Sequence, residues 1–119
     1  MKRVLVIDDV KEFAFPADTE VTYARTLDEG FWHLTDGIDE LWLDHDLGGD
    51  DTIRPLALKL AADAFNKIHW SIGLIVICSH NVVGVEWMKS TLSPYYPVIV
   101  CDTPQHLELL TGSSRAKWY

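Results

Sequence analysis

Four short apolar runs constrain this chain more than any other feature. They cover residues 3–8, 41–44, 73–79 and 97–101, and they are rich in Val, Ile and Leu. Because nearly every position is apolar, rather than every second one, each run is typical of a strand covered on both faces. Residues 20–24 form a weaker fifth candidate. The sequence therefore predicts a largely buried sheet of five strands.

A helix is predicted between the second and third of these runs. Apolar residues recur there at i, i+3, i+4 and i+7 spacing, which indicates one buried helical face. They are Ile53, Leu56, Ala57, Leu60, Ala61, Ala64, Phe65 and Ile68. Asp51 or Thr52 is available as the N-cap, and Pro55 suits the first turn.

Shorter helical patterns fit residues 27–35, 83–92 and 104–111, so strands and helices alternate along the chain. Such alternation predicts right-handed crossovers and a parallel sheet with helices on both faces. Residues 9–19 are barely long enough for a first helix, which we expect to be short or missing. With 119 residues, the chain has room for one such α/β domain.

Composition excludes some classes of partner. The formal net charge is -8, whereas broad binding to a nucleic-acid backbone needs an excess of Lys and Arg. No apolar stretch has the length of a membrane span, and the N-terminus lacks the features of a signal peptide. Cys78 and Cys101 lie in apolar runs without metal-ligand spacing, which favours free thiols and a cytoplasmic location. The oligomeric state is not predictable.

Three carboxylates are expected to meet at one edge of the sheet. Asp8 and Asp9 end the first apolar run, and Asp44 ends the second. Ligands of parallel sheets bind beyond the carboxyl ends of the strands, where the winding direction reverses. Oxygen-rich sites of this kind suit Mg²⁺ or Mn²⁺, which we predict as the cofactor. The alternative is that these aspartates cap helices or accept loop N–H groups.

The loop after the second run holds the densest cluster of reactive groups, with four carboxylates, one imidazole and two glycines in residues 44–51. His45 is a candidate general acid or base, Asp44 is a catalytic candidate as a nucleophile or through a metal-activated water, and Asp46 is a further catalytic candidate. Because side chains alternate along a strand, Asp44 and Asp46 are expected to share a direction that His45 does not. A structural role for His45 therefore stays open.

A hydroxyl, an imidazole and an amide follow the third run as Ser79, His80 and Asn81. They precede a predicted helix, where backbone N–H groups favour a bound phosphate. This position predicts a phosphate or ligand site in which Ser79 and His80 are catalytic candidates and Asn81 binds. The alternative is that Ser79 or Asn81 is simply the N-cap of that helix.

The order VLVIDD, LWLD and VICS resembles the receiver domain of bacterial response regulators over nearly the whole chain. The resemblance implies a flavodoxin-like fold with strand order 2-1-3-4-5. It also implies that Asp44 is the phosphoacceptor position, that Ser79 contacts the phosphoryl group and that the backbone of Asp46 is a metal ligand. Receivers carry a lysine at the end of the fifth strand, whereas residues 100–104 contain none.

A closer resemblance is to the cyclic-phosphate processing receiver domains. It rests on LDHDLG at residues 43–48 and on CSHN at residues 78–81, followed by Gly84 and Met88. Cys78 stands where the family has histidine, and His80 is a candidate substitute. This resemblance implies a hydrolase or binder of cyclic phosphates of nucleotides or RNA ends, from bacteria or their phages.

The main hypothesis is therefore a metal-dependent phosphoesterase whose ligand or substrate is a cyclic phosphate nucleotide or an RNA end. Two noncatalytic alternatives keep the same fold. One is a signalling module that is phosphorylated on Asp44, and the other is an interaction module that sequesters a ligand without turning it over.

Overall fold

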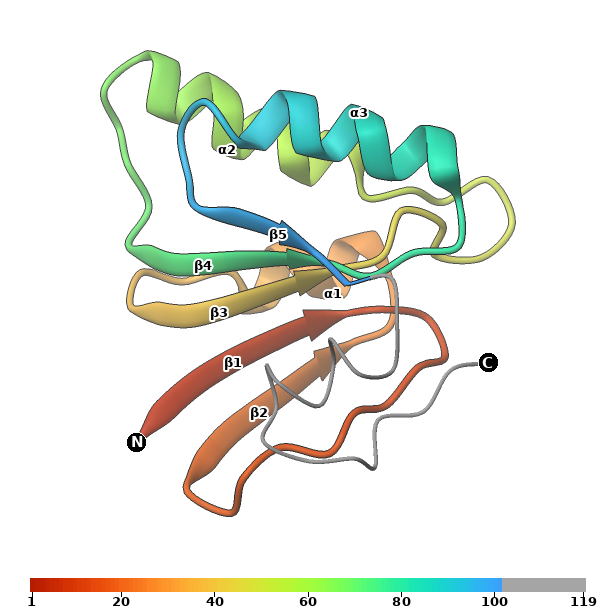
Figure 1. Cartoon of the computed structure of the whole chain (residues 1–119), viewed down its shortest axis with the longest axis vertical. Helices are drawn as coiled ribbons and strands as arrows, with labels where there is room; N and C mark the ends of the chain where they lie inside the picture. Colours follow the sequence, from red (N-terminus) through yellow and green to blue (C-terminus); the bar gives the residue numbers. More distant parts are fainter. Residues whose placement is uncertain (102–119) are drawn as a thin grey trace.

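The computed structural model describes residues 1–101, and a five-stranded parallel sheet lies at its centre (Figure 1). The strands are β1 (Lys2–Ile7), β2 (Thr19–Ala24), β3 (Ile38–Leu43), β4 (Ile72–Ile77) and β5 (Val98–Val100). Their order is β2-β1-β3-β4-β5, and all four neighbouring pairs are parallel. The predicted flavodoxin-like fold is confirmed, and each predicted strand is present with its ends within three residues of the prediction.

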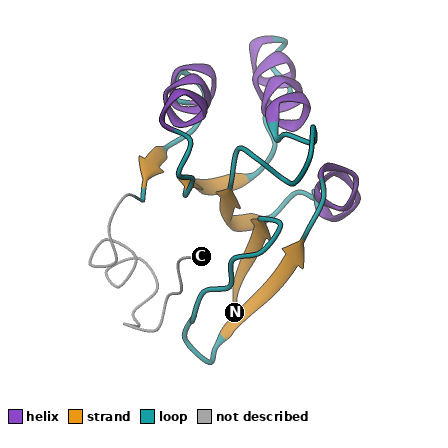
Figure 2. Ribbon diagram, turned by 90° about the vertical axis from the view of Figure 1, so that its right-hand side faces the viewer, coloured by secondary structure: helices purple, strands orange, loops and turns teal. Residues whose placement is uncertain are grey.

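Three helices connect these strands: α1 (Leu27–His33), α2 (Arg54–Phe65) and α3 (Val82–Leu92). All three lie on the same side of the sheet (Figure 2), so within residues 1–101 the prediction of helices on both faces is wrong. The other face is covered in this part of the chain by the β1–β2 connection, which forms no helix. No helix of residues 1–101 is long and apolar enough to cross a membrane. The predicted helix over residues 104–111 lies outside the described residues, as do the tail residues Trp118 and Tyr119.

The alternation of side chains along each strand divides the core into two clusters. In β1, Leu5 and Ile7 belong to the cluster beneath the helices, where they join residues such as Leu60 of α2. Val4 and Val6 belong to the cluster on the opposite face. Each cluster buries apolar area from several strands, which explains why the strand sequences are apolar at consecutive positions.

The connection from β1 to β2 covers the second face without a helix, as predicted for residues 9–19. Phe13 and Phe15 pack on the Trp42 ring, with centroids 4.8 and 5.2 Å away. The Tyr23 hydroxyl accepts a hydrogen bond from Phe13 N and donates one to Phe13 O, and each bond is 3.0 Å long. Aromatic packing and side-chain hydrogen bonds thus replace the helix in this segment.

The predicted ends of α2 need correction. The helix begins at Arg54, and its N-cap residue is Ile53, whose side chain makes no capping hydrogen bond. Asp51 instead accepts from Leu27 N at the start of α1 (3.0 Å), whereas Thr52 Oγ1 lies 3.4 Å from Arg54 N. Pro55 lies in the first turn, as predicted.

The helix also ends earlier than its apolar pattern suggests. Lys67, just beyond it, has a positive φ of 66°, a conformation that ends a helix. Ile68, beyond this turn, is exposed rather than buried, and so is Phe65, the last residue of the helix. Their spacing continues the helical pattern, but the backbone turns away before Ile68 can reach the core.

Candidate metal and phosphate site

The predicted carboxylate trio comes together where β1 and β3 end. Asp8 directly follows β1, Asp44 directly follows β3, and the two strands are neighbours at the point where the winding direction reverses. One oxygen each from Asp8, Asp9 and Asp44 lies within 4.8 Å of the others. Asp8 and Asp44 are buried and Asp9 is half-buried. This geometry is compatible with a shared cation.

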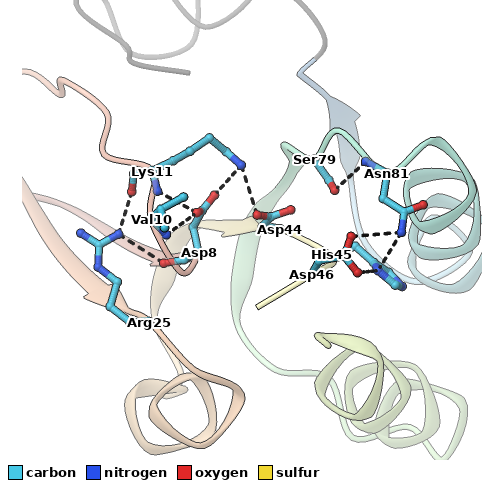
Figure 3. A network of polar contacts seen from close by, with 9 residues as sticks. All are labelled: Asp8, Val10, Lys11, Arg25, Asp44, His45, Asp46, Ser79 and Asn81. Atoms are coloured by element: carbon cyan, nitrogen blue, oxygen red, sulfur yellow. Dashed lines mark hydrogen bonds and ion pairs between the residues drawn. The ribbon is translucent and has the colours of Figure 1, made fainter. Parts of the chain in front are cut away.

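A lysine that the sequence analysis missed lies between two of these carboxylates (Figure 3). Lys11 Nζ is 2.9 Å from Asp8 Oδ2 and 3.1 Å from Asp44 Oδ2, and the residue is only 2% exposed. Burial opposes the ammonium charge, but the hydrogen bonds and charges of Asp8 and Asp44 raise the pKa of Lys11. The site therefore contains its own cation.

Asp44 is held in an environment that disfavours its charged form. Burial, followed by the charge of Asp8, raises the pKa of this carboxyl. Lys11 and a hydrogen bond from the Ser79 hydroxyl act in the opposite direction without cancelling the shift. The positive and hydrogen-bonding groups around Asp44 therefore do not fully offset the cost of its charge.

Lys11 supplies part of the positive charge that the carboxylates of this site need. Close packing of three carboxylates does not by itself require a divalent ion, because the ammonium neutralises part of their charge. The formal charges of Asp8, Asp9, Asp44 and Lys11 still sum to minus two. Carboxylate oxygens at this spacing are the ligands that Mg²⁺ and Mn²⁺ prefer, so the residues fit such an ion.

Side chains fix the loop that carries the acidic pair and Lys11. Asp8 Oδ1 accepts from the backbone N–H groups of Val10 (3.1 Å) and Lys11 (2.8 Å). Arg25, just beyond β2, donates to the carbonyl oxygens of Asp8 (3.2 Å) and Lys11 (2.8 Å). These bonds satisfy backbone groups that a helix would otherwise satisfy, and they orient the loop toward Asp44.

A cleft of about 220 Å³ opens beside the trio. Asp9, Val10 and Lys11 line it from the β1 side, and Asp44 and Asp46 follow from the loop after β3. Ser79, His80 and Asn81 line it from the β4 side. The structure thus gathers the predicted site residues around one cleft, with two exceptions. These are His45 and Asp8, which is buried and bound by Lys11.

His45 turns away from this cleft. It is buried, and its Nε2 accepts a hydrogen bond of 2.9 Å from Arg54 Nε. Because arginine can only donate, the proton of the neutral ring belongs on Nδ1, which is 3.0 Å from Asp46 Oδ1. Both nitrogens are therefore engaged by protein groups. This arrangement favours the structural alternative for His45 over general acid or base catalysis.

The His45 bond is one part of a network that holds the rim of the cleft. Asn81 Oδ1 accepts from Gly84 N (2.9 Å) as the N-cap of α3, while its Nδ2 donates to Asp46 Oδ2 (3.1 Å). The hydrogen bonds from His45 and Asn81 lower the pKa of Asp46. Asn81 is thus the cap that the alternative reading of this segment predicts, and it also fixes Asp46.

Cys78, which the resemblance aligns with a histidine of the family, is buried and does not line the cleft. Burial, followed by a hydrogen bond with Cys101, raises the pKa of its thiol. Cys78 thus offers no group that ionises near neutral pH. His80 is exposed and lines the cleft, so it is the imidazole placed to meet a ligand.

The fold and the acidic site at the ends of β1 and β3 define a receiver-like domain. The sequence model of a family described as "Cyclic-phosphate processing Receiver domain" matches residues 3–94, which include every residue that lines the cleft. The chain therefore belongs to the family of cyclic-phosphate processing receiver domains. No curated protein and no solved structure matches the chain.

Proposed function

We propose that the protein binds cyclic phosphates of nucleotides or RNA ends in this cleft and opens the phosphate ring with a divalent cation. The observation that carries the proposal is the composition of the cleft. Carboxylates and the Lys11 ammonium lie on one side, and the Ser79 hydroxyl and the His80 imidazole lie on the other. A phosphodiester needs both kinds of group, because its charge must be neutralised and its leaving oxygen protonated.

Asp8, Asp9 and Asp44 are the residues that would hold Mg²⁺ or Mn²⁺. Such an ion supplies positive charge at the phosphate and polarises its oxygens. Asp8 and Asp44 are anchored by the strands that precede them, so the carboxylates need little rearrangement to bind a cation together.

The remaining groups have separate roles in the proposed reaction. The Lys11 ammonium and the Ser79 hydroxyl bind phosphate oxygens and orient the ring. A water molecule attacks phosphorus and loses a proton to a carboxylate of the site, Asp9 being the half-buried candidate. The bond from phosphorus to one ring oxygen breaks, and His80 protonates that oxygen. The product is an open phosphate monoester.

The size of the cleft bears on the ligand. About 220 Å³ is below the ~300–1,000 Å³ of most small-molecule pockets. A cyclic phosphate and its ribose need only part of a typical pocket, and an attached base or RNA chain would extend into solvent. Cleft size therefore supports recognition of the phosphate end and not of a particular base.

A second candidate function is phosphorylation of Asp44 in a signalling module. It is favoured by the contacts of Lys11 and Ser79 with Asp44, because these groups would bind the incoming phosphoryl oxygens. Lys11 would then supply the charge that ordinary receivers take from the end of the fifth strand.

Phosphorus NMR tests both candidates. The full chain would be mixed with 2′,3′-cyclic and 3′,5′-cyclic nucleotides in Mg²⁺, in Mn²⁺ and in chelator. Ser79→Ala and His80→Gln are the test variants, and Asp28→Asn, on the exposed first turn of α1, is the control. We expect metal-dependent ring opening that both test variants weaken and the control retains. No ring opening by the wild-type protein would reject the hydrolase, and an acyl phosphate formed with a small phosphodonor would then favour phosphorylation.

A further inference from the structure

Lys11 lies where the proposed cation would bind. Its Nζ is about 3 Å from Asp8 Oδ2 and Asp44 Oδ2, two oxygens of the carboxylates that would coordinate the ion. A divalent ion would approach such oxygens to within ~2.0–2.6 Å. An ammonium and a divalent ion on the same pair of carboxylates would thus be separated by only a few ångströms. Their mutual repulsion is strong in a buried site, where screening by water is weak.

The other carboxylate oxygen of Asp8, Oδ1, is not available to bind the metal in place of Oδ2. Asp8 Oδ1 already accepts two backbone N–H groups, from Val10 and Lys11, which together use its two lone pairs. The oxygen that remains for a metal is Oδ2, and Oδ2 is the atom that the Lys11 ammonium holds. The conflict therefore concerns one identified atom and not only the general charge of the site.

We propose that Lys11 is the resident counter-ion of this site and competes with a divalent cation for Asp8 and Asp44. The inference rests on the proposed cation site. When the metal binds, Lys11 Nζ gives up these two oxygens, and its flexible side chain keeps the ammonium in the cleft that the residue lines. Metal binding then moves a positive charge toward the position proposed for the phosphate.

Competition lowers the metal affinity of the wild-type chain, so removal of the ammonium must raise it. Isothermal titration of the chelator-treated full chain with MnCl₂ measures this affinity directly. We expect Lys11→Met to bind Mn²⁺ roughly tenfold more tightly than the wild type, within the usual range of coupling between two ligands. Lys59→Met, which removes an exposed lysine paired with Asp63 in α2, is the matched control and leaves the affinity unchanged.

A second measurement does not depend on the variant being folded. In the wild-type chain, the side-chain NMR resonances of Lys11 are followed during titration with diamagnetic Mg²⁺. We expect the Lys11 ε-methylene signals to shift with the binding curve, whereas those of Lys59 stay in place.

The outcomes separate this inference from the proposed function. The competition would be overturned if the wild type and Lys11→Met bound Mn²⁺ with equal affinity, or if the Lys11 signals did not move while Mg²⁺ binds. Either result would leave the proposed cation site intact. Absence of binding by every variant would overturn both the competition and the metal-dependent function. Binding by Lys11→Met that exceeds binding by the wild type supports the inference.

Discussion

The imidazole ring of His45 lies directly against the backbone of Gly84 in the first turn of α3. A Cβ atom at Gly84 would be 2.4 Å from His45 Cγ and 2.6 Å from Cδ2, far closer than real Cβ contacts. The missing side chain at Gly84 therefore makes room for the ring between the Arg54 guanidinium and the cap of α3. This packing is the reason that His45 belongs to the interior and not to the cleft.

Gly84→Ala is expected to destabilise the protein, because the added methyl group must displace either the ring or the helix. Overpacking of this kind costs about 1–3 kcal/mol of unfolding free energy. Urea unfolding measures it. Val83→Ala, on the neighbouring exposed residue, is the control and is expected to stay within about 0.5 kcal/mol of the wild type. Equal stability of Gly84→Ala and wild type would contradict the tight packing described above.

The tautomer of His45 is a second testable consequence of this network. Arg54 Nε donates to His45 Nε2, so the neutral ring is expected to carry its proton on Nδ1. Long-range ¹H–¹⁵N NMR distinguishes the two ring nitrogens directly. In Arg54→Met the donor is absent, and we expect the other tautomer to become populated. A wild-type ring protonated on Nε2 would contradict the hydrogen bond from Arg54 and with it the structural role of His45.

Asp44→Asn is expected to make the metal-free protein more stable at neutral pH. Burial and Asp8 raise the pKa of Asp44 in the folded state above its ordinary value, so ionised Asp44 destabilises the native state. The penalty is fully present at pH values above the folded pKa and is lost as the pH falls below 3.8, where the carboxyl is protonated in both states. The free energy of unfolding of Asp44→Asn should therefore exceed that of the wild type most near pH 7 and little near pH 3.8.

Urea unfolding in chelator over this pH range provides the measurement. Asp50→Asn, in the exposed part of the loop after β3, is the control for loss of one negative charge. If Asp44→Asn were less stable than the wild type at pH 7, the contacts of Asp44 with Lys11 and Ser79 would outweigh the cost of its burial. If the gain did not shrink on acidification, it would not arise from ionisation of Asp44.

Much of the sheet could be predicted because a strand that is buried on both faces has apolar residues at consecutive positions of the sequence. β1, β3 and β4 are apolar at consecutive positions, and Asp8 and Asp44 mark where two of them end. The end of α2 could not be predicted in the same way. Its apolar spacing continues past Phe65, and only the backbone conformation at Lys67 stops the helix.

The carboxylates of the site were predictable, but the groups that hold them were not. Lys11 belongs to an irregular segment with no periodic pattern, so nothing local indicates that its side chain is buried. Its position three residues after Asp8 was the one available signal, combined with the need of clustered carboxylates for a counter-charge. Arg25 and Arg54 come from other elements, and the fold alone brings them to the site.

The two cysteines are expected to be unreactive in the native protein. Cys78 and Cys101 are 2% and 1% exposed, and burial together with Cys101 raises the pKa of Cys78. Because the thiolate is the reactive form, both protection from solvent and the raised pKa slow its modification.

Titration with a chromogenic disulfide should detect almost no thiol in the folded chain and two per chain in denaturant. Ser90→Cys, which adds an exposed thiol on α3, is the positive control and should react at once. Rapid reaction of Cys78 in the folded wild-type protein would show that it is accessible from the cleft and would restore it as a candidate for the chemistry of the family histidine.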